Sequence, residues 1–207
     1  MSLRSVGITS APSSVYASMS DIVRCFEDQK PLLTKLALLI TGDEFVAARC
    51  VENARESTLR SHSPFRDWIV EWAKTATIQN ALVRSARLIR SFEGVHKNQP
   101  CDHLEHLADD PERDFNGDLQ NVLRADAHVV IANLDPLSRA VLVLRLALRS
   151  SIRECAFRLN VSPLAVLGAN CRAMEWLASS CTTGAEEIAP DSLAFVRSEN
   201  KTASLNA

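Results

Sequence analysis

The sequence predicts an all-α protein made of two small helical domains joined by an acidic linker. Its 207 residues include only six glycines and eight prolines, and aromatic residues make up 5%, which leaves little for the turns of a sheet-rich fold. Apolar residues recur at spacings of three and four in several segments, as in amphipathic helices. These segments flank an acidic stretch that contains prolines and glycine, which is typical of a linker.

The composition indicates a globular protein, with 46% hydrophobic and 23% charged residues. The most apolar stretch, 140–148, is short and is broken by Arg145, so no membrane span is expected. The N-terminus has no apolar run of the kind that a secretory signal needs, and a cytoplasmic location is therefore expected. The six cysteines form no C-x-x-C pair and are interpreted as buried thiols: Cys25, Cys50, Cys101, Cys155, Cys171 and Cys181.

The formal net charge of −2 conceals a segregation along the chain. Residues 74–90 carry four basic side chains and no acid, residues 94–133 carry eight acids against three basic side chains, and residues 134–178 carry six arginines against three acids. Such blocks are usually solvated faces, but a basic, acidic, basic order also suits two modules that face nucleic acid.

The expected front domain spans residues 31–93, after an N-terminal extension of residues 1–30. A helix starts at Pro31 and stops at Thr41-Gly42, and Asp43 can cap the next one. A third helix follows the break at residues 62–64. Its apolar stripe is expected to lie in the core and comprises Phe65, Trp68, Ile69, Trp72, Ala76, Val83 and Leu88.

The expected rear domain spans residues 119–179, after a linker of residues 94–118. Residues 119–132 have a helical pattern, and Asp135-Pro136 begins a further helix. Ser151 can cap a short helix over residues 152–159, Asn160 suits a left-handed turn, and Ser162-Pro163 starts another helix. The pattern fits a helix-turn-helix unit or an ordinary helical hairpin. Residues 180–207 form a tail expected to be flexible, although residues 193–196 could fold back onto an apolar groove.

Several short motifs resemble those of a compact bacterial sigma factor of the extracytoplasmic-function type. The front motifs are Thr41-Gly42-Asp43-Glu44 with Ala47, and Phe65-Arg66-Asp67-Trp68-Ile69 with Ala73-Lys74. In the rear domain, Leu134 to Val141 is similar to the family's Leu-Pro-x-x-x-Arg stretch. Residues 151–162 are similar to its Ser-x-x-Glu-x-Ala-x-x-Leu-x-x-Ser helix-turn-helix core. Each motif is weak alone, and their order and spacing over residues 31–178 carry the resemblance.

The resemblance implies a transcription initiation factor that binds RNA polymerase core and promoter DNA and acts without cofactor or catalysis. The front domain would help to open the duplex, and the rear domain would contact the upstream duplex. The candidate DNA-binding residues are Lys74, Gln79, Asn80, Arg84, Arg87, Arg149, Arg153, Ser162, Asn170 and Arg172. Arg90 is a further possible cation. The candidate polymerase-binding residues are Asp43, Glu44, Glu52 and Asn53. An anti-sigma protein is a further candidate partner.

The sequence departs from the family pattern in the recognition helix. After Val166 the family usually has a basic, small, basic run, whereas this chain has Leu167-Gly168-Ala169 and no charge until Arg172. Gly168 inside a helix should also cost about 0.5 to 1 kcal/mol relative to alanine. Two alternatives therefore stay open: a degenerate sigma-like regulator that binds polymerase or an antagonist without reading DNA, and a helical interaction module unrelated to polymerase.

The sequence offers little support for an enzyme or a metal site. Phosphate-loop, dinucleotide-binding, hydrolase and zinc-protease motifs are absent from the sequence. Cys101, His103 and His106, with His96 nearby, resemble a zinc site, but a fourth ligand is missing and these residues are interpreted as part of a polar linker.

Overall fold

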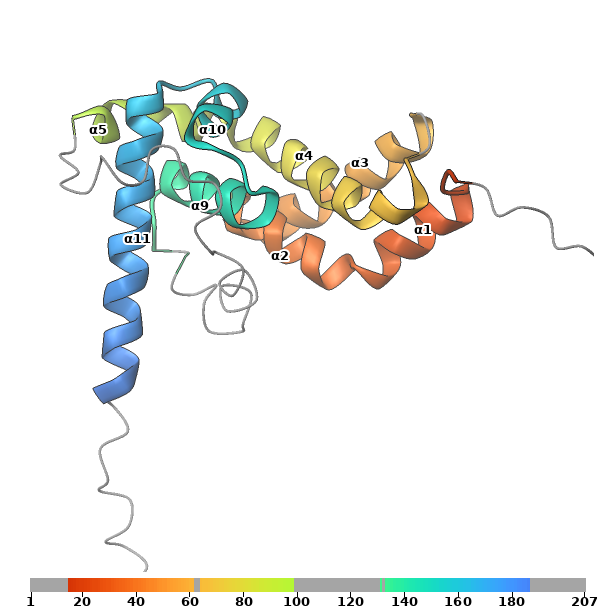
Figure 1. Cartoon of the computed structure of the whole chain (residues 1–207), viewed down its shortest axis with the longest axis horizontal. Helices are drawn as coiled ribbons and strands as arrows, with labels where there is room; N and C mark the ends of the chain where they lie inside the picture. The colour runs from red at the N-terminus through yellow and green to blue at the C-terminus, as the bar shows by residue number, and fades with distance from the viewer. Residues whose placement is uncertain (1–14, 62–63, 99–130, 132, 187–207) are drawn as a thin grey trace, which may run out of the picture.

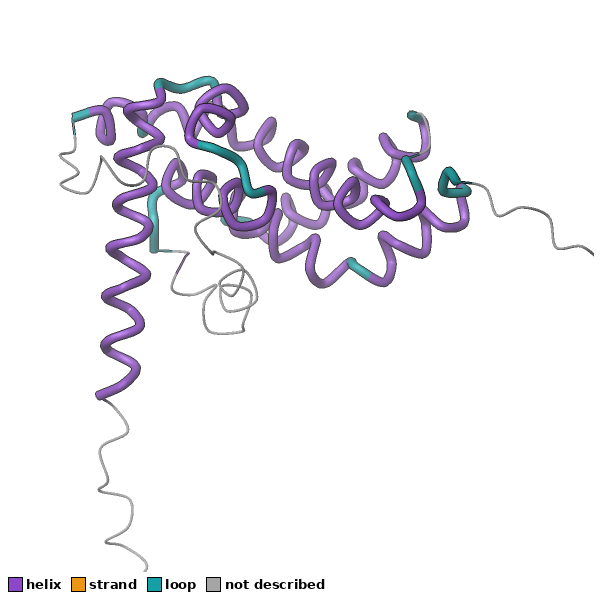
Figure 2. The backbone as a smooth tube through the Cα atoms, in the orientation of Figure 1, coloured by secondary structure: helices purple, strands orange, loops and turns teal. Residues whose placement is uncertain are grey.

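The computed structural model describes residues 15–61, 64–98, 131 and 133–186, and it is helical throughout except for short connections (Figures 1 and 2). The prediction of an all-α fold is confirmed for these residues, where the only β-structure is an isolated bridge between Tyr16 and Phe65. The helices are α1 (Met19–Asp28), α2 (Lys30–Thr41), α3 (Glu44–Arg60), a 3₁₀ turn (Arg66–Trp68), α4 (Ile69–Ser91), α5 (Glu93–Lys97), α9 (Pro136–Leu148), α10 (Ile152–Leu159) and α11 (Pro163–Glu186).

Local capping explains where the front helices begin and end. Gly42 ends α2 in the left-handed conformation, with φ of 71°, and Asp43 caps α3 by accepting a hydrogen bond of 2.8 Å from the Val46 amide. Both boundaries confirm the sequence prediction. The N-terminal extension contains an additional helix, α1, which begins at a capping box formed by Ser18 and Asp21.

The helix α4 buries a different stripe from the one predicted. Its buried residues are Ala73, Thr77, Ile78, Ala81, Leu82, Ser85 and Ile89, and α4 packs between α2 and α3 through this face. Alanines on this stripe allow close approach to the neighbouring helices. The bulkier predicted stripe is largely exposed, with Trp68 66%, Val83 77% and Leu88 48% accessible. Its assignment to the core is therefore wrong for these residues, whereas Ile69 and Ala76 of the same stripe are half-buried and pack against a core cluster.

The helix α9 lies at the centre of the molecule and joins the two predicted domains in one core. Asp135 caps α9 and Pro136 follows at its first position, as predicted. The helix packs against α2, α4 and α11, and ten of its 13 residues are buried, including Arg145. One continuous cluster of buried side chains extends from Leu36 on α2 to Ala173 on α11. Separation of the chain into two independent domains is therefore not confirmed.

The rear helices follow the predicted boundaries closely. Ser151 and Glu154 form a capping box at the start of α10, and Asn160 ends this helix in the left-handed conformation, with φ of 53°. The Ser162 hydroxyl accepts a hydrogen bond of 3.3 Å from the Ala165 amide at the start of α11. The helices and the turn of the predicted helix-turn-helix are confirmed.

Two segments that were predicted to be a linker and a flexible tail contain helix. The helix α5 occupies the start of the predicted linker, and α11 continues to Glu186, into the predicted tail. In Figure 1, α11 lies across one end of the body and its C-terminal half extends away from the other helices. The helical prediction for residues 119–132 lies outside the described residues except at Ile131, which is buried in the core. Within the described part of the chain, no helix is long and apolar enough to cross a membrane.

The cysteines agree only in part with the prediction of buried thiols. Cys25, Cys50 and Cys155 are free and buried, and burial raises the pKa of the Cys155 thiol to about 12. Cys171 is disulfide-bonded, so the prediction is wrong at this position. Cys101 and Cys181 lie outside the residues whose side chains are described.

Candidate nucleic-acid interface

Aromatic side chains gather where the N-terminal segment meets the start of α4. The rings of Tyr16 and Phe65 stack with their centroids 5.0 Å apart, and Phe65 meets Trp68 edge to face at 5.6 Å. Trp68 and Trp72 are 66% and 45% exposed. Since α4 is already buried on its opposite stripe, these rings remain open to a ligand that stacks on aromatic surfaces.

The exposed face of α4 carries polar and cationic side chains beyond these rings. Gln79, Arg84 and Arg87 are exposed. Two other predicted contacts are already engaged: the Lys74 ammonium pairs with Glu71 at 2.6 Å, and the Asn80 amide donates to the Ala76 carbonyl at 2.9 Å. Three of the five predicted residues on α4 therefore remain available to bind a ligand.

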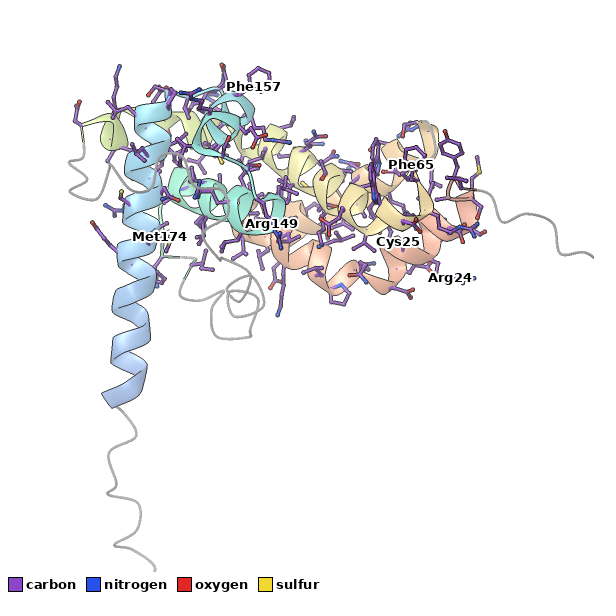
Figure 3. All side chains as sticks on the ribbon, in the orientation of Figure 1. Arg24, Cys25, Phe65, Arg149, Phe157 and Met174 are labelled. Atoms are coloured by element: carbon purple, nitrogen blue, oxygen red, sulfur yellow. The ribbon has the colours of Figure 1, made fainter. Side chains whose placement is uncertain are left out.

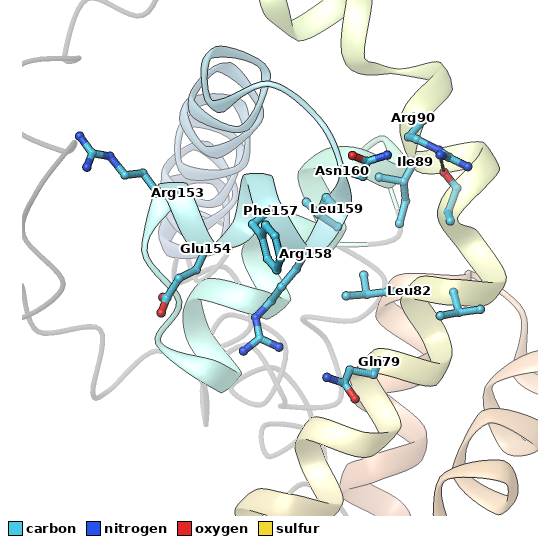
Figure 4. Close-up of a pocket in the computed structure, with 12 residues that line it drawn as sticks. Gln79, Leu82, Ile89, Arg90, Arg153, Glu154, Phe157, Arg158, Leu159 and Asn160 are labelled. Atoms are coloured by element: carbon cyan, nitrogen blue, oxygen red, sulfur yellow. Dashed lines mark hydrogen bonds between the residues drawn. The ribbon is translucent and has the colours of Figure 1, made fainter. Parts of the chain in front are cut away.

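A groove of about 920 Å³ separates α4 from α10 (Figure 4). Its apolar lining includes Leu82, Val83 and Ile89 from α4 and Phe157 and Leu159 from α10. Its polar lining consists of Gln79, Arg90, Arg153, Glu154, Arg158 and Asn160. The groove lies between helices of the two predicted domains and brings two sequence-predicted residues, Gln79 and Arg153, to the same feature.

The remaining predicted DNA contacts of the rear helices lie in different environments. Arg149 is exposed and ends α9 in the left-handed conformation, with φ of 50°. The Ser162 side chain caps α11, and its backbone amide donates to a Glu93 carboxylate oxygen at 2.9 Å. Arg172 is half-exposed and lies 3.3 Å from Asp135.

The helix α11 does not offer its predicted reading face to solvent. Asn170 is 2% exposed, and Val166, Gly168 and Ala169 are buried, because α5 and α9 pack against this helix. A Cβ atom at Gly168 would overlap the carbonyl oxygen of His96, so glycine allows α5 to approach closely. In this conformation Asn170 is buried and is not presented to a base edge, and its role as a DNA contact stays a prediction.

A buried polar cluster around Asp135 fixes α5 and α11 against the start of α9. His96 Nε2 lies 3.0 Å from Asp135 Oδ1, and Arg172 Nε lies 3.3 Å from Asp135 Oδ2. The Ser138 hydroxyl donates to the same carboxylate at 2.7 Å. Burial raises the pKa of Asp135, but His96 and the Ser138 hydrogen bonds outweigh it and hold the pKa well below its usual value. The cluster therefore favours an ionised Asp135.

The predicted polymerase-binding residues all lie on α3 or at its start. They differ in exposure and in whether their side chains already form hydrogen bonds or ion pairs. Glu44 is exposed, whereas the Asp43 carboxylate caps the helix. Glu52 pairs with Arg55 at 2.9 Å and with Lys30 at 3.7 Å, and Asn53 is half-buried. Phe45 is 71% exposed and lies under the Arg49 guanidinium.

Five interface candidates were missed from the sequence: Tyr16, Phe157 and Arg158 were not singled out, and Trp68 and Trp72 were assigned to the core. Tyr16 lies in a segment with no helical pattern, so its contact with Phe65 depends on the tertiary structure. The position of Phe157 was detectable, since in α10 the buried stripe is Ile152, Cys155, Ala156 and Leu159. A phenylalanine that falls outside this stripe and precedes Arg158 is a signal of an exposed aromatic side chain.

No group of metal-ligating side chains occurs among the described residues. The predicted cluster of Cys101, His103 and His106 lies outside them. Comparison with known proteins adds no assignment: no family model, no curated protein and no solved structure matches this chain.

Proposed function

We propose that this protein is a sigma-factor-like transcription initiation factor that binds RNA polymerase core and promoter DNA. The motif order along residues 31–178 supports the proposal. So does the agreement of α10, its turn and the start of α11 with a helix-turn-helix. The protein acts by binding, without catalysis of its own.

The exposed face of α4 is the observation that carries the proposal. It presents Trp68 and Trp72 at one end and Arg87 and Arg90 towards the other. Among described residues the only acid on this helix is Glu71, which pairs with Lys74. Aromatic rings that stack bases, followed by cations that neutralise phosphates, suit a strand of melting DNA.

The decisive experiment combines polymerase capture with transcription. The full-length chain should bind core polymerase and direct transcription from pooled genomic fragments. The double change of Trp68 and Trp72 to alanine should lower open-complex formation by about tenfold or more, since base stacking contributes about 1 to 3 kcal/mol per base. Trp68 meets Phe65 edge to face, a contact worth about 0.5 to 1.5 kcal/mol, so urea unfolding of the variant accompanies the assay to show that the fold is retained.

A matched control is Val95→Ala, which removes an exposed apolar side chain from α5, away from the α4 face. Glu44→Arg should weaken polymerase capture, whereas Glu27→Arg on α1, also exposed, should leave it unchanged. Failure of the unaltered chain both to capture core polymerase and to alter transcription would refute the proposal and favour an interaction module unrelated to polymerase.

The burial of α11 favours a second candidate function, a sigma-like regulator that binds polymerase or an anti-sigma protein without reading promoter duplex. Asn170 is buried, and the described exposed side chains of α11 are Pro163, Leu164, Arg172 and Glu175. Such a surface offers little for the major groove. Duplex binding that falls steeply with salt and is lost on changing Arg149 and Arg153 to alanine would exclude this candidate.

A further inference from the structure

The groove between α4 and α10 has an open aromatic side chain on one wall. Phe157 is 88% exposed, although its neighbours Ala156 and Leu159 are buried. Figure 4 shows its ring beside the Arg158 side chain on α10. An exposed phenylalanine beside a guanidinium offers a π-face and a cation to the same ligand.

The charges of the groove favour an anionic ligand. Its lining contains three arginines and one glutamate. That glutamate, Glu154, accepts a hydrogen bond of 2.7 Å from the Ser151 amide at the start of α10, and in Figure 4 the side chains of Glu154 and Arg153 both point away from α4. Arg153 and Arg158 form no ion pair with any carboxylate in the described part of the chain. Arg90 and Arg158 therefore leave the groove with a positive charge that Glu154 only partly offsets.

The groove lies on the same face of α4 as Trp72. Trp72, Gln79, Val83 and Arg90 follow one another at spacings of seven and four, so they lie on one face of the helix, and Trp68 precedes Trp72 by four residues in the 3₁₀ turn that leads into α4. All five are exposed. From Trp68 to Arg90 this stretch spans about 33 Å, at 1.5 Å per residue over 22 residues. A ligand in the groove can therefore continue along α4 to the tryptophans.

We infer that the groove between α4 and α10 binds single-stranded nucleic acid. Phe157 stacks on a base, Arg90 and Arg158 neutralise phosphates, and the amide groups of Gln79 and Asn160 are within the same lining to hydrogen-bond base edges. Aromatic and cationic side chains both occur in the groove and along the α4 face, and this combination favours a nucleic-acid strand over an acidic amphipathic helix. Such a helix would bind mainly to the apolar side chains of the groove and would not need a ring on which a base can stack. This inference deepens the proposed function by naming a single strand as the ligand of this groove.

The test uses the full chain without polymerase and a labelled oligothymidylate of about 16 nucleotides, the upper range of single-strand site sizes. Phe157→Ala and Phe157→Leu should each weaken binding about tenfold, whereas Phe157→Trp should retain it, because only the aromatic variant keeps the stacking surface. Arg158→Ala should weaken binding and reduce the slope of log affinity against log salt by about 0.7.

Matched controls use exposed residues of the same types elsewhere on the surface. Phe45→Ala removes an exposed phenylalanine from α3, and Arg24→Ala removes an exposed arginine from α1, at the opposite end of the body (Figure 3). Neither change should alter oligothymidylate binding. Equal losses in the control and groove variants, or equal binding by Phe157→Leu and Phe157→Trp, would overturn the inference. So would failure of oligothymidylate to bind while a synthetic acidic amphipathic peptide binds and depends on Phe157.

The groove and the proposed function fail in distinguishable ways. Oligothymidylate binding that depends on Phe157, without polymerase capture, supports the groove and refutes the initiation factor. Polymerase capture together with oligothymidylate binding that is unchanged by substitution of Phe157 and Arg158 supports the initiation factor and refutes the groove.

Discussion

At the scale of single residues, Gly168 shows how one missing side chain sets the position of a helix. In isolation, a glycine in a helix interior is a weak point, about 0.5 to 1 kcal/mol worse than alanine. Here a Cβ atom would overlap the His96 carbonyl oxygen of α5. Glycine is therefore required for the contact between α5 and α11, and its cost to the helix is offset by packing.

Gly168→Ala should lower the free energy of unfolding by about 1 to 3 kcal/mol, because the added methyl group forces α5 and α11 apart. Urea unfolding followed by circular dichroism measures this change. Gly94→Ala is the matched control: nothing lies within 4 Å of its added Cβ atom, so it should be neutral or stabilise by up to about 1 kcal/mol. Stabilisation by both variants would contradict the close approach at Gly168.

The contribution of Asp135 to the stability of the fold should depend on pH. Its pKa in the folded protein lies below its ordinary value of 3.8. Its contribution to stability is therefore fully present above that value and is lost as the pH falls through the folded pKa. The titratable or charged groups that face it are His96 on α5 and Arg172 on α11, with Arg139 on its own helix.

Asp135→Asn should destabilise the protein by about 1 to 3 kcal/mol at neutral pH, because asparagine still caps α9 but removes the charge that faces His96 and Arg172. The difference from the unaltered protein should shrink as the pH falls below 3.8. Urea midpoints measured across this pH range test the prediction. Asp28→Asn, at an exposed position, should show no comparable loss, and a difference independent of pH would contradict the role of the charge.

At the scale of secondary-structure elements, capping decides the boundaries of the short helix α10. Its eight residues are too few for a stable isolated helix. The capping box of Ser151 and Glu154 and the left-handed Asn160 fix its ends. Its four buried residues fix it to the core. The position of Phe157 and Arg158 in the lining of the groove depends on both.

Ser151→Ala should lower the free energy of unfolding by about 0.5 to 2 kcal/mol, because the Glu154 amide loses its acceptor at the start of α10. Ser151→Thr keeps a capping hydroxyl and should restore most of the loss. Chemical denaturation of both variants provides the measurement. Equal destabilisation by alanine and threonine would show that the cap is not the cause.

At the scale of the whole molecule, the shared core makes the two predicted domains mutually dependent. The helix α9 contacts α2 and α4 on one side and α11 on the other. Its residues Leu137, Val141 and Leu144 are fully buried. Removing α9 and the other rear helices would expose the apolar surfaces of α2 and α4 that α9 covers. The free-energy cost would grow with the apolar area exposed.

The chain should therefore unfold in one cooperative transition. Variants that retain only Trp72 on α4 or only Trp176 on α11 should give the same urea midpoint by fluorescence. Leu144→Ala should lower both midpoints together, by about 2 to 5 kcal/mol of unfolding free energy. Leu164→Ala, at a half-exposed position of α11, should have a smaller effect. Two separate midpoints would show instead that the front and rear helices fold independently.

Part of the candidate interface could be predicted from the sequence, because its cations occur in basic segments. The candidates Gln79, Arg84, Arg87 and Arg153 are exposed, whereas Trp68 and Trp72 were assigned to the core, because an apolar stripe does not show whether another helix covers it. The availability of Lys74 and Asn80 could not be predicted, because it depends on which neighbour accepts their hydrogen bonds. The burial of Asn170 could not be predicted, because the covering helix α5 lies in a segment predicted to be a linker.

The sequence by itself determined the all-α class and the ends of several helices, since Gly42, Asp43, Ser151 and Asn160 act on backbone groups a few residues away. Only the tertiary structure decided which face of α4 is buried, that α9 joins both halves, and that α5 covers α11. The physical reason is that burial depends on how side chains of distant segments fit together. Periodicity marks an apolar stripe but does not name the surface it packs against.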